Sequence, residues 1–285
     1  MIPASFAYTR AATLDEAVAA VGAGAKIIAG GQSLLPLLKL RLAHADRLVD
    51  IGRLAELKGV RQLDDGRIGV GSLTTYHELM DSPAMHYGVL KDALPGIGDL
   101  QVRNRGTVGG AIAHADPASD LPACLLALDA EIVARSSRGE RSIQATEFFQ
   151  GAFEPALTDD EVLTEIRLPA PLDGAGSAYA SLEQTASGYA LVGVAAVVVR
   201  ATAGGPISFA TVAVTGVHEH AYRASEVEEA LVGSDGSSGA IEAAVAHATD
   251  EVEVNADIHA DAAYRTAMAA VYARRAIEAA LARIG

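Results

Sequence analysis

Two pairs of adjacent glycines constrain this 285-residue chain more than any other feature of its sequence. Gly30 and Gly31 lie in AGGQSLLPLLKLRLA, and Gly109 and Gly110 lie in NRGTVGGAIAHADPASD. We expect an apolar strand before each pair. Glycine adopts φ > 0 without steric cost and lets a ligand or another backbone approach closely. Each pair therefore predicts either a tight turn or a surface where a ligand contacts the main chain.

The first pair lies between a strand ending at Ala29 and a helix that we expect to begin directly afterwards. Ser33 is the predicted N-cap, and Pro36 falls in the first turn, where a missing N–H costs nothing. The N–H groups of residues 31–34 are then unpaired and convergent, which is the chemistry of a diphosphate site. The pattern matches neither the P-loop nor the nicotinamide G-x-G-x-x-G motif. Taken alone, this loop is equally compatible with a plain turn.

The second pair is accompanied by Gly106 and followed by two acidic residues, Asp116 and Asp120. A carboxylate after a glycine-rich loop suits a ribose hydroxyl, as in other dinucleotide sites. The alternative is that both carboxylates cap a helix beginning at Leu121. Together, the two loops predict a long ligand with a diphosphate in its middle.

The order of predicted elements divides the chain into residues 1–53, 54–173 and 174–285. The first range alternates helix and strand in a βαβ pattern. The second opens with a hairpin at Asp65-Gly66, continues with helices and the second glycine loop, and ends with the strand in EVLTEIRLP. The third places the β-rich runs YALVGVAAVVVR and ISFATVAVTG before several helices, an α+β arrangement.

Charge and composition exclude several function classes. The formal net charge of -14 disfavours binding to nucleic acid or anionic membranes, which requires clustered Lys and Arg. No apolar run reaches the roughly 20 residues of a membrane span, and MIPASFAYTR does not resemble a secretory signal. We therefore expect a cytoplasmic protein without a membrane span.

The single cysteine, Cys124, excludes an internal disulfide, a thiolate zinc site and an iron–sulfur cluster built by this chain alone. We expect Cys124 to be a small buried apolar residue. The eight histidines show no metal-ligand spacing, although His218 and His220 alternate near a strand end, so no metal site is predicted. Redox chemistry would require an external cofactor.

Three motifs, AGGQSLLP, LQVRNRGTVGGAIAHADPASDLPA and DIHADAAYR, resemble the FAD-binding medium subunits of molybdenum hydroxylases. The carbon monoxide dehydrogenase medium subunit and the flavin domain of xanthine dehydrogenase belong to this family. The resemblance covers the whole chain in order. It implies an α+β fold in which two α/β subdomains clasp an extended FAD, followed by a C-terminal α+β domain with a three-stranded sheet and helices.

The resemblance also implies the cofactor-binding positions. The first loop would hold the diphosphate, the second loop would surround the diphosphate, ribose and flavin side, and Tyr189 would lie near the flavin; its alternative is a core tyrosine. No catalytic side chain is implied, because the isoalloxazine ring carries the chemistry. The implied cofactor-binding residues are Ala29, Gly30, Gly31, Gln32, Ser33, Leu34, Leu35, Gly106, Thr107, Gly109, Gly110, His114, Asp116, Asp120 and Tyr189.

The family's activity implies an electron-transfer role. Non-covalent FAD would receive electrons from [2Fe–2S] clusters on partner subunits and pass them to an external acceptor. The implied partners are a small iron–sulfur subunit and a large molybdenum subunit, in an assembly with two copies of each chain. The substrate of such a complex binds on the large subunit, so CO, a purine, an N-heterocycle, an alkaloid and an aldehyde all stay open.

The sequence departs from the family at several positions. Carbon monoxide dehydrogenases usually read AGGHSL, whereas this chain has Gln32, which argues against CO as the substrate. Family members often carry Lys, Arg and a Gly-Asp pair before the tyrosine, where this chain has Ser181, Gln184 and Ser187-Gly188. Pro155 replaces a common Thr. These departures leave an alternative open: a structural subunit of the same complex that has lost or weakened FAD binding.

Overall fold

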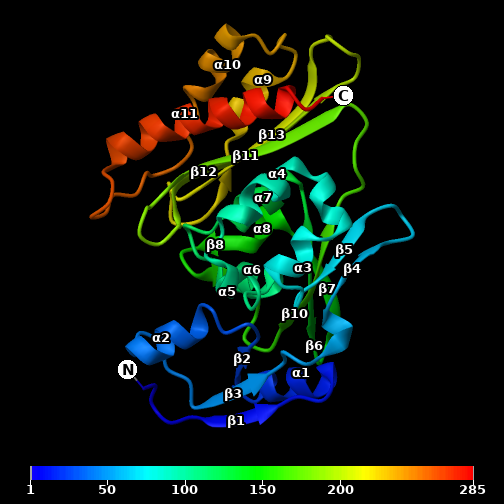
Figure 1. The fold of residues 1–285 in the computed structure, drawn as a ribbon, viewed down its shortest axis with the longest axis vertical. Helices are drawn as coiled ribbons and strands as arrows, with labels where there is room; N and C mark the ends of the chain where they lie inside the picture. Colours follow the sequence, from blue (N-terminus) through cyan, green and yellow to red (C-terminus); the bar gives the residue numbers. More distant parts are fainter. Residues whose placement is uncertain (1, 285) are drawn as a thin grey trace.

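The computed structural model describes residues 2–284 as three units stacked along the long axis of the molecule (Figure 1). Each unit contains one principal sheet, and these sheets lie within residues 7–50, 60–168 and 175–223. The chain runs from the N-terminal unit through the central unit to the C-terminal unit without returning (Figure 1). Among the described residues, no helix combines the length and apolar character that crossing a membrane requires.

The N-terminal unit is a parallel three-stranded sheet in the order β1-β3-β2, with helices in its connections. The expected βαβ pattern is confirmed, and the Thr13 side chain caps α1 through the N–H of Glu16. The strand β1 was not expected from the sequence, because its four residues are all exposed. The elements are β1 (Ala7–Arg10), α1 (Leu14–Gly22), β2 (Lys26–Ile28), α2 (Leu34–Leu40), β3 (Arg47–Asp50) and the 3-10 helix η1 (Ala55–Leu57).

The central unit contains a five-stranded antiparallel sheet in the order β4-β5-β10-β6-β7. Its first hairpin turns at Gly66, which has a φ of 84°, as the Asp-Gly pair predicted. The strands are β4 (Val60–Gln62), β5 (Ile68–Gly71), β6 (Glu131–Ser136), β7 (Gly139–Gln144) and β10 (Val162–Leu168), with a small separate hairpin of β8 (Phe149–Gly151) and β9 (Glu154–Pro155).

Short helices cover this sheet and carry the second glycine loop. Cys124, on α7, is completely buried, which confirms the expected apolar role, and burial raises the pKa of its thiol. The segment before Gly106 is a helix rather than the expected strand. The helices are α3 (Tyr76–Met80), η2 (Pro83–His86), α4 (Gly88–Ala93), η3 (Leu94–Gly96), α5 (Leu100–Arg103), α6 (Val108–His114), α7 (Asp120–Ala127) and α8 (Ala145–Phe148).

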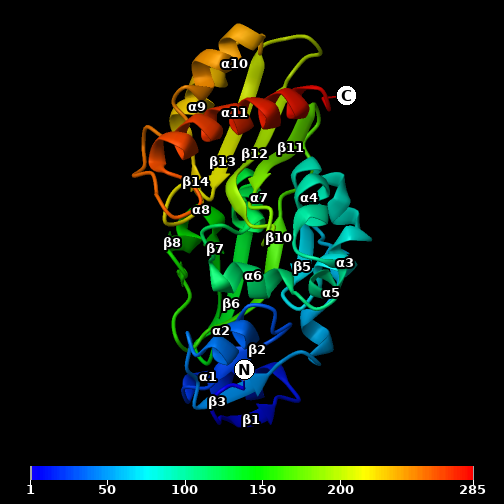
Figure 2. The same cartoon turned by 60° about the vertical axis from the view of Figure 1, so that its left-hand side comes forward.

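The C-terminal unit contains a four-stranded antiparallel sheet in the order β11-β12-β13-β14. The expected three long strands are present, and the two-residue β14 adds a short fourth strand that corrects the expected count. The long helix α11 lies across β11, β12 and β13 (Figure 2). The elements are β11 (Ala175–Glu183), β12 (Ala190–Arg200), β13 (Ile207–Thr215), β14 (Tyr222–Arg223), α9 (Ser225–Leu231), α10 (Ser238–Val245) and α11 (Ala262–Leu281).

Both faces of the C-terminal sheet are buried, which explains the nearly continuous apolar sequence of β12. Side chains alternate between the two faces of a strand. Val194 and Ala196 join the core beneath α11, whereas Ala195 and Val197 join the core of the central unit. The helices α4 and α7 of the central unit pack on this second face. The central and C-terminal units therefore share one core.

Candidate functional site

The first glycine loop connects β2 to α2 and presents unpaired main-chain donors. Gly31 has a φ of 75°, as predicted for one glycine of the pair. Within residues 2–284, the N–H groups of residues 30–34 have no protein acceptor. Ser33 occupies the N-cap position of α2 but its side chain makes no capping hydrogen bond, contrary to our expectation. An anionic group can bind such a set of unpaired N–H groups.

Gly30 is required for a different reason, the contact between the N-terminal and central units. A Cβ at this position would overlap the carbonyl oxygen of Arg105 and lie 2.8 Å from its carbonyl carbon. Gly106, the next residue, is 3.2 Å from the same position. The two glycine loops therefore meet backbone to backbone. The glycine pair predicted such a close approach, but at Gly30 the partner is the protein's own main chain and not a ligand.

The second glycine loop uses its glycines mainly for packing within the central unit. Gly109 donates its N–H to the Ser72 carbonyl at 2.9 Å, and a Cβ on it would lie 2.7 Å from the Ser72 Cα. Gly110 donates its N–H to Thr107 Oγ1 at 3.2 Å. Both glycines are helical residues of α6, so neither adopts the positive φ that the sequence allowed. Their N–H groups already donate to protein acceptors, whereas those of the first loop do not.

His114 and Asp116 follow α6 and lie beside the same region. The His114 ring stacks on Phe153 with ring centroids 5.0 Å apart. Burial lowers the pKa of His114, partly opposed by Asp116, and Lys26 of β2 lowers it further. Asp116 Oδ1 accepts a hydrogen bond from the Ala118 N–H at 3.0 Å, an Asx turn that leaves Oδ2 without a hydrogen-bond donor among residues 2–284.

Asp120 does not cap a helix, contrary to the alternative that the sequence offered. The helix α7 begins at Asp120 itself, with Ser119 at the N-cap. Its carboxylate is buried and accepts a 2.5 Å hydrogen bond from the hydroxyl of Tyr179 on β11. Burial raises the pKa of Asp120 to about 6, although the hydrogen bond from Tyr179 works in the opposite direction. Asp120 thus joins the second loop to the C-terminal sheet.

Tyr189 precedes β12 and is 45% exposed, so it is not a core residue. Burial of its hydroxyl raises the pKa of Tyr189, and the charges of Asp116 and Asp120 raise it further. The N–H of the next residue, Ala190, donates to the Ala118 carbonyl at 3.2 Å, which places Tyr189 beside the segment that carries both carboxylates. The structure brings these three sequence-predicted residues together.

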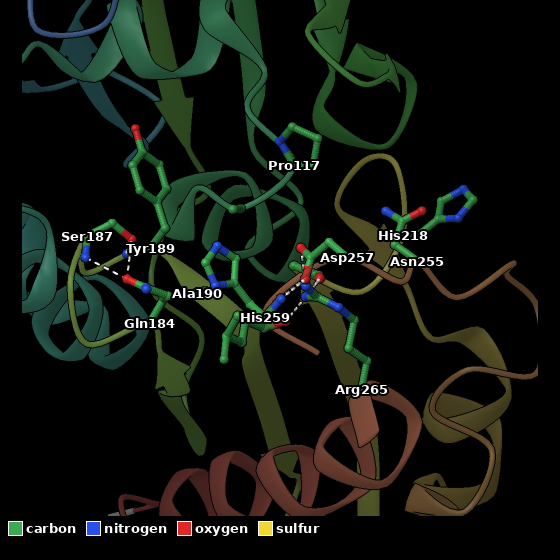
Figure 3. A pocket seen from close by; sticks show the side chains of 13 residues that line it. Pro117, Gln184, Ser187, Tyr189, Ala190, His218, Asn255, Asp257, His259 and Arg265 are labelled. Carbon is green, nitrogen blue, oxygen red and sulfur yellow. Dashed lines mark hydrogen bonds and ion pairs between the residues drawn. The ribbon is translucent and has the colours of Figure 1, made fainter. Parts of the chain in front are cut away.

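A pocket of about 220 Å³ lies beside Tyr189, between the end of the second loop and the C-terminal unit (Figure 3). Pro117 borders it on one side, and the polar turn that contains Gln184 and Ser187 borders it on another. The Gln184 side-chain oxygen accepts hydrogen bonds from the Ser187 N–H and hydroxyl, so these family departures form an ordered turn.

The motif DIHADAAYR supplies a wall of this pocket that the predicted site residues did not include, and Arg265 is its buried member. Arg265 is 4% exposed and donates to the carbonyl oxygens of Leu191 and Gly216, and to Asp257 at 2.6 Å. Burial opposes the charged form of Asp257, but the N–H groups of His259 and Ala260, together with Arg265, hold its pKa below the usual value. The motif itself was the available signal, since it stood out in the sequence.

Comparison with known proteins identifies the family. Residues 4–171 match the model of the FAD binding domain in molybdopterin dehydrogenase, and residues 177–280 match the CO dehydrogenase flavoprotein C-terminal domain. The chain belongs to this family. Its cofactor is accordingly FAD, and it is a subunit of an oxidoreductase, as the motifs predicted.

Two relatives and a solved structure match over nearly the full length of this chain. The chain is 38% identical to the carbon monoxide dehydrogenase medium chain of Hydrogenophaga pseudoflava, over 99% of both chains. It is 36% identical to the glyceraldehyde dehydrogenase medium chain of Sulfolobus acidocaldarius, over 98% of this chain and 99% of the relative. The structure superposes on that of carbon monoxide dehydrogenase from Hydrogenophaga pseudoflava with a TM-score of 0.95 and 40% identity, covering 100% of both chains.

Replacing Gly30 by alanine is expected to weaken FAD binding roughly tenfold or more. The added Cβ forces the two glycine loops apart, and overpacking of this kind costs about 1–3 kcal/mol. Flavin-fluorescence titration of the FAD-free protein measures the effect. Gly22→Ala is the matched control, because no atom lies within 4 Å of its added Cβ. Wild-type affinity in Gly30→Ala would show that loop contact does not shape the site.

The raised pKa of Asp120 predicts a specific pH dependence of stability. Its folded-state pKa of about 6 exceeds the ordinary value of 3.8, so the protonated form is favoured by folding. This stabilisation is complete below pH 3.8 and is lost as pH rises towards and through 6, at up to about 1.4 kcal/mol per pH unit. Asp120→Asn should remove this trend from chemical-denaturation curves measured between pH 4 and 7. The exposed Asp64→Asn variant should retain it, and equal pH trends in both variants would contradict the assignment.

Proposed function

We propose that this chain is the FAD-carrying electron-transfer subunit of a molybdenum-containing hydroxylase or dehydrogenase of the carbon monoxide dehydrogenase type. It takes electrons from [2Fe–2S] clusters on a partner and passes them to an external acceptor. The observation that carries the proposal is the set of unpaired N–H groups at residues 30–34, at the contact between two glycine loops. The full-length family match supplies the identity of the cofactor.

The residues at this contact fit an FAD molecule. The amides of residues 30–34 would hold the diphosphate, in the loop that turns at Gly31 with its positive φ. The second loop contributes Thr107 and the unpaired oxygen of Asp116, which suits a ribose hydroxyl. Tyr189 lies at the flavin end. Bound FAD supplies the redox chemistry, because it exchanges both single electrons and electron pairs.

Asp120 is retained in the proposed site, but its position changes its role. The carboxylate is buried against Tyr179, so its effect on the cofactor passes through the placement of the second loop. Asp120→Ala should weaken FAD binding, and Tyr179→Phe should weaken it similarly if that placement is what matters. A direct ribose contact instead predicts that only the Asp120 variant loses affinity.

We propose a small iron–sulfur subunit and a large molybdenum subunit as partners, in a cytoplasmic dimer of heterotrimers. A flavin receives electrons only within tunnelling distance of a cluster, which requires a stable interface with the cluster-bearing chain. The relatives are named for different substrates, among them carbon monoxide and glyceraldehyde, so family membership leaves the substrate open.

The alternative is a structural subunit that has lost or weakened FAD binding. Its support is the polar turn around Gln184 and Ser187, which carries no Lys or Arg where family members often have one. A cation near the flavin pyrimidine stabilises the reduced anion. The turn borders the pocket beside Tyr189 but does not contact residues 30–34 in any described hydrogen bond.

The purified protein should be yellow and contain one FAD per chain, bound non-covalently. The sequence offers no recognisable His or Cys attachment point, and Cys124 is fully buried. Acid precipitation followed by absorbance of the supernatant at flavin wavelengths measures both properties. Flavin retained in the pellet would contradict non-covalent binding. A colourless protein that does not bind added FAD would establish the structural alternative.

Co-expression with the neighbouring genes should give a complex containing two copies of each of three subunits, visible by native mass spectrometry. The isolated chain should transfer electrons from an artificial donor to a dye but hydroxylate no organic substrate, because one cysteine cannot hold a cluster. A monomer that binds neither neighbour would overturn the subunit assignment, even if the chain binds FAD.

A further inference from the structure

His218, Glu219 and His220 form a cluster in the loop between β13 and β14. One potential ligand atom from each side chain lies within 4.8 Å of the others. In an extended strand the glutamate would point away from the two histidines. Consecutive bends at residues 216–220 bring all three side chains together instead. The sequence alone predicted no metal site here, because a bent loop cannot be inferred from the alternation of His218 and His220.

Hydrogen bonds fix the same tautomer in both imidazole rings. His218 Nδ1 lies 2.7 Å from the Glu253 carbonyl oxygen, and His220 Nδ1 lies 2.9 Å from the Ala221 carbonyl oxygen. A carbonyl oxygen only accepts, so each Nδ1 must carry a hydrogen. With Nδ1 used in this way, Nε2 is the ring nitrogen left to act as a metal ligand. Metal-binding histidines use this arrangement, in which one nitrogen donates to a carbonyl and the other is the ligand.

The rings are also held in place by their neighbours. The centroids of His218 and His220 are 4.9 Å apart at an angle of 73°, and the His218 ring packs edge-on against Tyr222. Both histidines are half-buried, whereas Glu219 is exposed. Two oriented imidazoles beside an accessible carboxylate give a preformed set of three ligands with an open outer side.

We propose that His218, Glu219 and His220 bind a divalent transition-metal ion of the zinc class. Two imidazole nitrogens and one carboxylate oxygen are a ligand set that Zn²⁺ uses with a fourth position left for water. Imidazole suits Zn²⁺, Cu²⁺ and Ni²⁺, whereas Mg²⁺ and Ca²⁺ prefer oxygen ligands. The net charge of -14 adds a general attraction for cations.

The site adjoins the pocket beside Tyr189 and shares His218 with it. His218 borders the pocket, and its imidazole lies on the opposite side from Tyr189 (Figure 3). The Asn255 N–H donates to the Val217 carbonyl at 2.8 Å, which ties this loop to the segment leading to Asp257 and His259. A bound ion would therefore stiffen one wall of this pocket. The inference does not depend on FAD binding.

A second cluster, Glu226, His247 and Asp250, provides an internal control. All three side chains are exposed, and His247 Nδ1 already pairs with Asp250 at 2.7 Å. That contact raises the pKa of His247 and occupies its Nδ1. His247→Gln removes an imidazole from the same unit while leaving the proposed site intact.

Titration of the full chain with Zn²⁺ against a chromophoric chelator tests the proposal. Wild-type protein should bind one Zn²⁺, and Mg²⁺ in excess should not displace it. His220→Gln and Glu219→Gln should each lower the affinity at least tenfold, whereas His247→Gln should leave it unchanged. Zn²⁺ should raise the thermal midpoint of the wild type and of His247→Gln, but not that of the other two variants.

The Glu219→Gln variant should fold normally, because this exposed side chain makes no described hydrogen bond, so a loss of Zn²⁺ binding in it cannot be ascribed to misfolding. Metal-free melting curves confirm that each variant is folded before titration. The proposal is overturned by absence of Zn²⁺ binding, by undiminished binding in both His220→Gln and Glu219→Gln, or by loss of binding in His247→Gln alone.

Discussion

The rest of the site depends on the backbone contact between the two glycine loops. Gly30 allows the first loop to approach the Arg105 carbonyl so closely that a Cβ would not fit. That contact joins the N-terminal and central units at the point where residues 30–34 present unpaired N–H groups. The adjacent glycines therefore act differently: Gly30 permits the contact, and Gly31 gives the loop its positive φ. Gly30 shapes the contact between the loops and Gly31 shapes the loop that carries the N–H donors, so both glycines are required.

The C-terminal unit completes the site because its sheet is buried on both faces. The second loop is held to this sheet by the Ala190 and Gly216 N–H groups, which donate to the carbonyl oxygens of Ala118 and Pro117. Thr215 donates its hydroxyl to the Pro117 carbonyl at 2.8 Å. Buried hydrogen bonds of this kind fix relative position as well as adding stability. These hydrogen bonds thus hold the start of β12, and with it Tyr189, beside the end of the second loop.

Sequence reasoning succeeded where local chemistry decides the structure. The turn at Gly66, the cap at Thr13 and the positive φ of Gly31 all follow from residue type and neighbours. It failed where contacts distant in sequence determine the structure. The exposed strand β1 forms only because β3 offers a partner, and no hydrophobic pattern in its own residues predicts it. Asp120 resembled a helix cap because it precedes LPACLLA, but Tyr179, which is 59 residues away, accounts for its burial. Likewise, the glycines at 106 and 109 serve packing against Tyr76 and Ser72, which sequence spacing does not reveal.

We expect the departures from the family pattern to act on the reduced state of the cofactor more than on its binding. The turn at residues 184–188 carries no cation, and the carboxylates of Asp116 and Asp120 act on Tyr189 nearby. Negative charge at the flavin end opposes an anionic reduced flavin, whereas oxidised FAD carries its own charge mainly at the diphosphate. The amides that we propose for the diphosphate, those of residues 30–34, lie in a different unit of the molecule. We therefore expect the absence of a cation beside Tyr189 to lower the reduction potential more than the FAD affinity, and this separation favours a flavoprotein over a subunit that has lost its cofactor.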